Sequence, residues 1–158
     1  MTLYYIRKAN LCNLFRVEKI LYRCGKDMAQ KYGLKHWDNS HIKNILILVL
    51  CVMKNRIYLV TDEQRRVVAT FQTKRAGDTL YFLKLATDPA FSGKGIGTFC
   101  IQTIEKMSVN AGCSKVCCEV YDQSIHAIRF YENRGYTVCG SDKTLKYTQL
   151  RMERQLRS

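Results

Sequence analysis

The feature that most constrains the fold is a strand-like segment that runs into alternating glycines and then directly into a helix-like segment. The strand covers residues 78–87, and Pro89 closes it because the residue before a proline avoids helical backbone. The glycines at 93, 95 and 97 lie in a loop over residues 91–97, and a helix follows over 98–111. Glycines allow positive φ and close approach of the backbone, and a helix N-terminus favours a phosphate. The segment therefore predicts an anion site.

The spacing of these glycines excludes two familiar nucleotide loops. A dinucleotide-binding loop has the pattern GxGxxG, whereas Gly97 follows Gly95 after one residue. A phosphate loop of the Walker type ends in Gly-Lys-Ser/Thr after a four-residue gap, which the sequence lacks. Taken alone, the loop also fits a turn that binds nothing.

The other segments predict one mixed sheet covered by helices, because hairpins in the middle are followed by a strand–helix–strand crossover. Apolar runs predict strands at 3–8, 56–61, 66–73, 115–121, 136–139 and 145–156. Helical periodicity predicts helices at 10–32, after a cap at Asn39 or Ser40, and at 124–134. The second of these helices is expected to bury one stripe of Ile42, Ile45, Leu46, Val49 and Leu50.

Length and composition indicate a single globular domain over residues 1–158. The eight cysteines form no CxxC pair and no zinc-like spacing, so we expect reduced thiols and a cytoplasmic protein. No signal peptide is expected, and the longest apolar run, 45–53, is too short to span a membrane. The net charge of +13 is dispersed along the chain, which favours a solvated basic surface or a polyanionic ligand over nucleic acid.

A second segment makes the interpretation of the first one more specific. It reads Glu119-Val-Tyr-Asp-Gln-Ser-Ile-His-Ala-Ile-Arg-Phe-Tyr-Glu-Asn-Arg-Gly-Tyr136. Together the two stretches resemble the GNAT superfamily of acetyl-CoA-dependent N-acetyltransferases. The family pattern is Val-x-Pro, Arg/Gln-x-x-Gly-x-Gly/Ala, then Asn-x-x-Ala, Phe-Tyr and Gly-Phe. The matching residues, in order, are Asp88-Pro89, Gly93 to Gly97, Ala127, Phe130-Tyr131 and Gly135-Tyr136. The resemblance is specific over residues 80–136. Two positions depart from it: Ser92 stands where the family has Arg or Gln, and Ser124 stands where it usually has Asn.

The resemblance implies a division of labour within an acetyl-CoA site. The backbone of Leu85, Ala86 and Thr87 would pair with the pantetheine arm as an added strand does. The pyrophosphate would be cradled by Ser92, Gly93, Lys94, Gly95, Ile96, Gly97 and Thr98. Ser124 and Ala127 would line the pantetheine near the thioester. Tyr131 would protonate the departing thiolate, since a phenol pKa of about 10 is close to that of an alkyl thiol. A tyrosine packed on the inner face of its helix is the other interpretation of Tyr131.

The resemblance also implies an α/β (α+β) GNAT fold with a mixed, mostly antiparallel sheet of seven strands and four helices. The expected reaction is direct attack of a primary amine on acetyl-CoA, which serves as cosubstrate, without a metal. The strand before the loop lacks a carboxylate, so Glu18, Glu119 and Asp122 remain alternatives for the general base. A basic protein repels polycations, so we expect a small amine such as an amino acid. Other functions stay open: acetylation of a protein amine, or a non-catalytic acyl-CoA-binding or nucleic-acid-associated module. A homodimer is also possible on this sequence.

Overall fold

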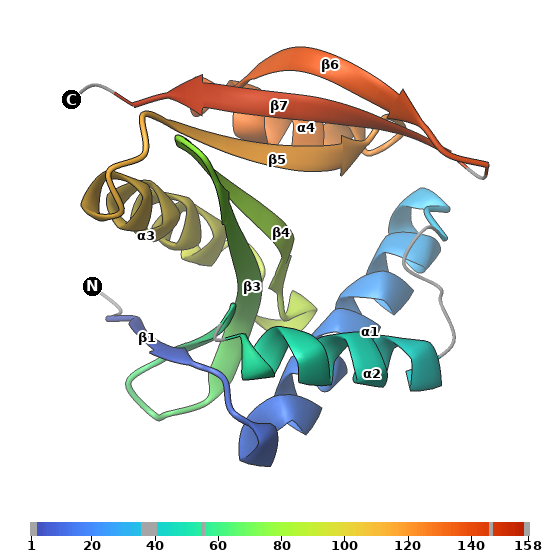
Figure 1. Ribbon diagram of the computed structural model, residues 1–158. Helices are drawn as coiled ribbons and strands as arrows, with labels where there is room; N and C mark the ends of the chain where they lie inside the picture. Colours follow the sequence, from blue (N-terminus) through green and yellow to red (C-terminus); the bar gives the residue numbers. More distant parts are fainter. Residues whose placement is uncertain (1–2, 36–40, 55, 146, 157–158) are drawn as a thin grey trace. The chain divides into compact units, whose positions relative to one another are not determined.

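The computed structural model of the protein describes residues 3–35, 41–54, 56–145 and 147–156 (Figure 1). The strands are β1 (Tyr5–Lys8), β2 (Ile57–Thr61), β3 (Val67–Ala76), β4 (Thr79–Thr87), β5 (Lys115–Tyr121), β6 (Thr137–Lys143) and β7 (Thr148–Gln155). The α-helices are α1 (Leu14–Tyr32), α2 (His41–Met53), α3 (Ile96–Asn110) and α4 (Ile125–Glu132). Short 3-10 turns occur at Leu11–Asn13 and Pro89–Phe91.

The strands form one mixed sheet in the order β1-β2-β3-β4-β5-β7-β6. β1 and β2, β2 and β3, β5 and β7, and β6 and β7 pair antiparallel. β4 and β5 pair in parallel over four positions, from Thr79–Lys115 to Phe82–Cys118. The crossover between these two parallel strands contains α3. The expected fold class, a mixed sheet of seven strands with four helices, is therefore confirmed.

The ends of α1 follow the sequence signals. The side chain of Asn10 accepts a hydrogen bond from Asn13 N–H, and the Asn13 side chain accepts one from Asn10 N–H, which caps the short turn that leads into the helix. Gly33 ends the helix in the left-handed region with φ 66°.

Contacts divide the chain into two compact units. The first unit comprises residues 1–73 and 84–102, and the second comprises residues 74–83 and 103–158. β3, β4 and α3 each contribute to both units.

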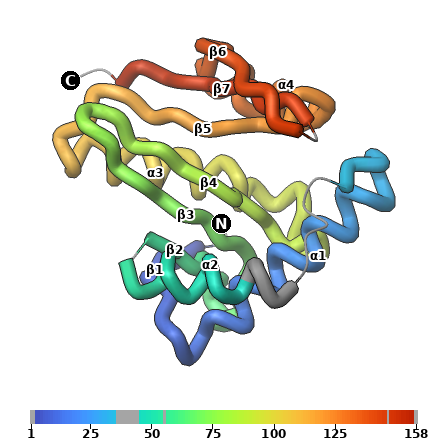
Figure 2. The backbone as a smooth tube through the Cα atoms, turned by 45° about the vertical axis from the view of Figure 1, so that its right-hand side comes forward, coloured from blue at the N-terminus to red at the C-terminus, as the bar shows by residue number. Residues whose placement is uncertain are grey.

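The core of the first unit lies between α1, α2 and β2 (Figure 2). It contains Ala9, which follows β1, and buried apolar side chains from all three elements: Leu14, Val17, Leu48, Val52, Ile57 and Leu59. These side chains hold α1 against the strands, and α1 carries residues that reach the loop after β4.

The core of the second unit contains a cluster of aromatic rings from β4, from α4 and from Tyr136, the residue before β6. The Phe82 ring lies 5.7 Å from Tyr131 and 6.1 Å from Tyr136 between centroids. Tyr136 is buried, and its hydroxyl donates to Glu105 Oε1 at 3.2 Å. Arg154 contacts the same carboxylate at 2.8 Å. These contacts fix α4 on its strands.

The prediction of which face of α2 is buried is wrong. Leu48 and Val52 are buried, and Val49 and Cys51 are partly buried beside them, whereas Ile45, Leu46 and Leu50 are exposed. From Ile45 to Met53 every residue of the helix is apolar, so periodicity cannot indicate which face is buried. The side chain of Ile42 and the proposed caps Asn39 and Ser40 lie outside the described residues.

Among the described residues, no helix has both the length and the apolar character needed to cross a membrane.

Candidate active site

The loop between β4 and α3 presents backbone N–H groups at the start of a helix. Asp88 begins it: its carboxylate accepts from Ala90 N–H at 3.1 Å and caps the turn Pro89–Phe91. α3 begins at Ile96, two residues earlier than predicted, so Gly97 lies in the first helical turn. Within the described residues, the N–H groups of Gly93, Gly95 and Ile96 donate to no backbone carbonyl. N–H groups at a helix N-terminus commonly bind anions.

Two of the three glycines are required by the backbone itself. Gly93 and Gly95 both have φ +75°, in the left-handed region that side chains disfavour. A Cβ built at either position meets no atom within 4 Å among the described residues. The glycines thus create the loop conformation and leave open space beside it.

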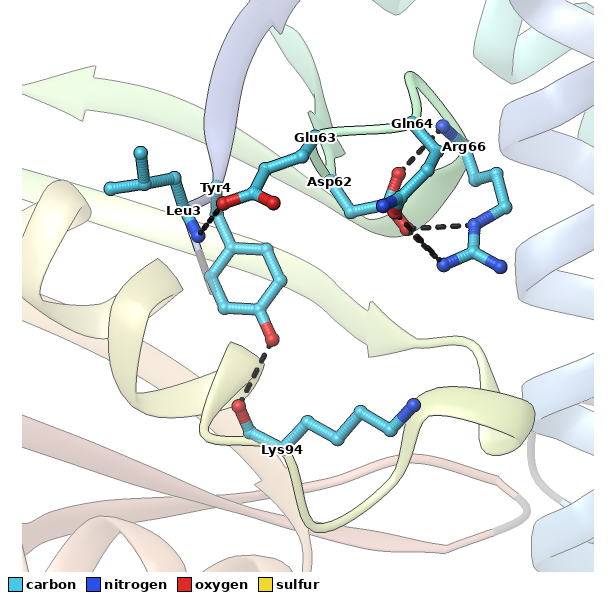
Figure 3. A network of polar contacts seen from close by, with 7 residues as sticks. All are labelled: Leu3, Tyr4, Asp62, Glu63, Gln64, Arg66 and Lys94. Carbon is cyan, nitrogen blue, oxygen red and sulfur yellow. Dashed lines mark hydrogen bonds and ion pairs between the residues drawn. The ribbon is translucent and has the colours of Figure 1, made fainter. Parts of the chain in front are cut away.

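A tyrosine far away in the sequence supports this loop. The Tyr4 hydroxyl donates to the Lys94 carbonyl at 3.0 Å (Figure 3). The Tyr4 ring also lies 5.4 Å from the Phe99 ring, on the first turns of α3. Sequence reasoning missed Tyr4, because no local pattern links a residue before β1 to a loop 90 positions later.

Cations gather around the same loop. The Lys94 ammonium lies 5.1 Å and the Arg66 guanidinium 5.0 Å from the centroid of the Phe91 ring. Arg23 of α1 pairs with Asp88 at 2.7 Å. Arg66 in turn is held by Asp62, whose carboxylate contacts both the guanidinium and the backbone N–H of Arg66 (Figure 3). Although burial alone raises the pKa of Asp62, the hydrogen bonds from Arg66 outweigh it and lower that pKa below its usual value.

The residues predicted to pair with pantetheine lie at the end of β4. Ala86 is buried, and Leu85 and Thr87 are half-buried. Just before them, Lys84 has φ 49°, an uncommon backbone conformation for a lysine. It follows the last β4–β5 pair, Phe82–Cys118, by two residues. The strand is thus irregular immediately before the predicted pantetheine segment. Burial lowers the pKa of the Lys84 ammonium.

The remaining predicted residues share one face of α4 in the second unit. Ser124 precedes the helix, and its carbonyl accepts from Ala127 N–H and Ile128 N–H at 3.0 Å. Ser124, Ala127 and Tyr131 follow each other at intervals of three and four residues, so they line up along the helix. Tyr131 is 9% exposed and lies 5.3 to 5.8 Å from the rings of Phe82, Phe130 and Tyr136. This packing fixes the position of its ring.

The alternatives for the general base are spread over the two units. Glu18 lies on α1, Glu119 is exposed on β5, and Asp122 follows β5. Asp122 N–H donates to the Thr148 carbonyl at 3.1 Å, which holds the backbone at the end of β5. Within the described ranges, no three His, Cys, Asp or Glu side chains gather as a metal ion would need; catalysis without a metal stays a prediction.

Comparison with known proteins identifies the family. The sequence profile described as the acetyltransferase (GNAT) family matches residues 18–136. The uncharacterized protein YdhI of Bacillus subtilis (strain 168) is 33% identical over 111 residues, which cover 70% of this chain and 68% of that protein.

Two solved structures share the fold. PaiA N-acetyltransferase from Thermoplasma acidophilum, in complex with coenzyme A, has a TM-score of 0.77 at 18% identity and covers 98% of this chain and 99% of its own. Ard1 from Thermoplasma volcanium has a TM-score of 0.75 at 19% identity, with 98% and 99% covered. The PaiA structure contains coenzyme A, and this chain shares its fold.

The profile match includes the glycine loop and all of α4, the two segments on which the sequence resemblance rests. The expected enzyme class, an acyltransferase acting on amines, is that of the family. The chain belongs to the acetyltransferase (GNAT) family.

Proposed function

We propose that the protein transfers an acetyl group from acetyl-CoA to the primary amine of a small molecule such as an amino acid. The observation that carries this proposal is the loop from Gly93 to Gly97, whose N–H groups stand at the start of the 15-residue helix α3. N–H groups and a helix dipole together favour a diphosphate. The two glycines at φ +75° keep the approach to them open.

Each predicted segment has a distinct task in this proposal. Ser92 to Thr98 would hold the diphosphate of coenzyme A, and the backbone of Leu85 to Thr87 would hydrogen-bond its pantetheine arm. Ser124 and Ala127 would line the arm near the thioester. Ser92 is shorter than the Arg or Gln expected there, so the backbone and Lys94 would supply most of the grip.

The proposal treats residues 1–158 as a single catalytic domain. The family profile supports this, since its span of 18–136 includes parts of each unit without interruption. A single domain is also supported by β3, β4 and α3, because each of them contributes residues to both units.

The proposed chemistry is a direct transfer. The neutral amine nitrogen attacks the thioester carbonyl carbon, a C–N bond forms, and the C–S bond breaks. The leaving thiolate takes a proton from Tyr131, and a carboxylate or water takes the proton that the amine gives up. Glu18, Glu119 and Asp122 are the candidates for that base. Because ammonium groups have a pKa of about 10, the acceptor ammonium must lose a proton before it attacks at neutral pH.

The net charge of the protein limits the classes of amine that we propose as acceptor. A net charge of +13 repels polyamines and other polycations, whereas amino acids and neutral small amines escape this repulsion. A panel of amino acids, neutral amines, spermidine, an aminoglycoside and basic peptides, with detection of free coenzyme A thiol, tests the proposal. We expect an amino acid or neutral amine to give the highest kcat/KM. A higher kcat/KM for spermidine or an aminoglycoside would refute the proposed small-amine class, and one for a peptide would identify a protein amine.

The same assay separates an enzyme from a binding module. Tight binding of acetyl-CoA without turnover on any amine would indicate a non-catalytic acyl-CoA-binding protein. Salt-dependent retention of DNA would indicate a nucleic-acid-associated module, because phosphate contacts weaken steeply with salt.

We further propose a cytoplasmic location. All eight cysteines are free thiols in the structure, and several lie buried in the cores, as Cys100, Cys113, Cys117 and Cys118 do. Oxidising compartments favour disulfides, so this pattern suits a reducing one. Fractionation of cells that produce the protein tests this location.

A further inference from the structure

Lys84, near the end of β4, has a backbone conformation that is uncommon inside a strand. Among the described residues, two that are not glycine have positive φ: Arg65 at 60° and Lys84 at 49°. Arg65 lies in the loop between β2 and β3, and hairpin loops commonly contain one such residue. Lys84 lies within the strand Thr79–Thr87, where a left-handed residue costs free energy. Residues with such strain cluster at functional sites, so the Lys84 side chain is a candidate for a functional role.

The Lys84 side chain is half-buried near α2, and it has no counter-ion within the described residues. Burial lowers the pKa of its ammonium, and the nearby Cys51 thiol of α2 counteracts this in part. With the described residues Lys84 makes no ion pair and no side-chain hydrogen bond. Removing an ammonium from water without a partner is unfavourable, and a bound anion would offset that cost.

The strand around Lys84 does not supply this anion. The segment from Leu80 to Thr87 contains neither Asp nor Glu, and Lys84 is its one charged residue. The next acidic residue along the chain, Asp88, is already paired with Arg23 at 2.7 Å and caps the turn that follows it. We therefore expect a ligand to provide the negative charge.

The proposed direction of acetyl-CoA brings its reacting end toward Lys84. In the proposed function the diphosphate lies on the loop after β4, and the pantetheine arm pairs with the backbone of Leu85 to Thr87. Because the loop follows the strand, the arm runs back along the strand toward Leu85. The thioester at the far end of the arm then comes next to Lys84, which is bonded directly to Leu85. The loop, the strand segment from Lys84 onward and Cys51 all belong to the first compact unit.

We infer that Lys84 binds the carboxylate of an amino-acid acceptor and so determines the specificity of the proposed transfer. The inference rests on the proposed function, since it assumes that the thioester lies beside this residue. In an α-amino acid the amine and the carboxylate share one carbon, so an ammonium that holds the carboxylate also fixes the amine near the thioester. Lys84 stays protonated in this role and takes no proton from the amine.

This role separates the classes of amine that the net charge alone leaves together. A neutral amine without a carboxylate gains nothing from Lys84, and a polyamine is repelled by it. An amino acid gains a hydrogen bond between charged groups, which is stronger than one between neutral groups. The absence of Asp and Glu from residues 80–87 suits the same ligand, because an acidic side chain there would repel its carboxylate.

Steady-state kinetics with the best amino acid of the panel and with its primary carboxamide test the inference. The preference is the kcat/KM of the amino acid divided by that of the carboxamide. In Lys84→Met we expect this preference to fall by about tenfold or more, through a higher KM for the amino acid. Comparing variant with intact protein cancels the difference in amine pKa between the two acceptors. Methionine is unbranched like lysine and carries no charge, so the midpoint of thermal unfolding should stay equal or rise.

Two further variants show whether the charge at this position is responsible. Lys84→Arg keeps the charge and should retain more of the preference than Lys84→Met does. The matched control is Lys54→Met, which removes one charge from an exposed position directly after α2 and should keep the preference of the intact protein.

The possible failures of the inference and of the proposed function are distinguishable. An unchanged preference in Lys84→Met, or equal loss of kcat/KM for both acceptors, would overturn the inference. A higher kcat/KM of the intact protein for the carboxamide or for neutral amines than for any amino acid would also overturn it, and would leave acetyl transfer to a small amine standing. If no amine releases coenzyme A thiol, the proposed function and the inference fail together.

Discussion

The glycine loop after β4 and the inner face of α4 carry the two halves of the sequence resemblance, yet they are built in different ways. In the proposed site the loop works mainly through its backbone: N–H groups that donate to no backbone carbonyl within the described residues, and two residues at φ +75°. The α4 face works through side chains, of which Tyr131 is packed among three aromatic rings. A backbone site tolerates changes of side chain, such as Ser92, but not changes of conformation. A side-chain site depends on the identity of its side chains and tolerates small changes of backbone conformation.

Tyr131→Phe should give the largest effect. If the hydroxyl protonates the leaving thiolate, kcat should fall by about 100-fold or more, while the Kd for acetyl-CoA changes by less than about twofold. The ring contacts with Phe82 and Tyr136 remain in the variant, so stability should change little. Steady-state kinetics and calorimetry measure the two quantities.

Tyr136→Phe is the matched control in the same aromatic cluster. It removes the hydroxyl that donates to Glu105 at 3.2 Å, so it should lower the free energy of unfolding by about 1 kcal/mol and leave kcat unchanged. An unaltered kcat in Tyr131→Phe would show that this tyrosine only packs, and that another group protonates the thiolate.

Gly95→Val should break the backbone site. A β-branched residue at φ +75° is strained by about 1 to 2 kcal/mol, and relief of that strain would turn the loop N–H groups away. The Kd for coenzyme A should rise by about tenfold or more. Gly112→Val provides the control, because Gly112 has φ +71° after α3 and similarly open space. It should lose comparable stability and keep its affinity. If both variants bind coenzyme A equally well, the loop does not hold the diphosphate.

The same contrast explains how much the sequence could predict. The glycine spacing and the helix signal predicted the loop after β4 and the helix that follows it, because a backbone conformation is encoded locally by the residues that adopt it. The register of α4 was also predictable, since Ser124, Ala127 and Tyr131 keep helical spacing. The mixed character of the sheet followed from hairpin and crossover rules, whereas the position of β7 between β5 and β6 was not predicted.

Features that depend on distant contacts were not predictable. The buried face of α2 was assigned wrongly, since a helix that is apolar all round gives no periodic signal and only its neighbours select Leu48 and Val52. One cavity of the first unit is lined by Arg16, Lys19 and Arg23 of α1, by Arg65 and Arg66 of the β2–β3 turn, and by Asp88, and these three segments share no motif. Its charge was visible only as a dispersed surplus.

Tyr4 is the residue where the two modes of construction meet, because one side chain supports the backbone of the loop. Tyr4→Phe removes the hydrogen bond to the Lys94 carbonyl and keeps the ring contact with Phe99, 5.4 Å away. A neutral hydrogen bond near the surface contributes about 1 kcal/mol, and only part of this would reach the ligand. We therefore expect the Kd for coenzyme A to rise by about threefold, with kcat unchanged.

Tyr5→Phe is the control for this smallest effect, because Tyr5 is the next residue and its side chain is 55% exposed. It should alter neither Kd nor stability by a measurable amount. A Kd in Tyr4→Phe equal to that of the intact protein would mean that the glycines hold the loop unaided. A rise above about thirtyfold would mean that the loop conformation depends on a side chain, and the contrast between backbone and side-chain sites would then fail at its clearest point.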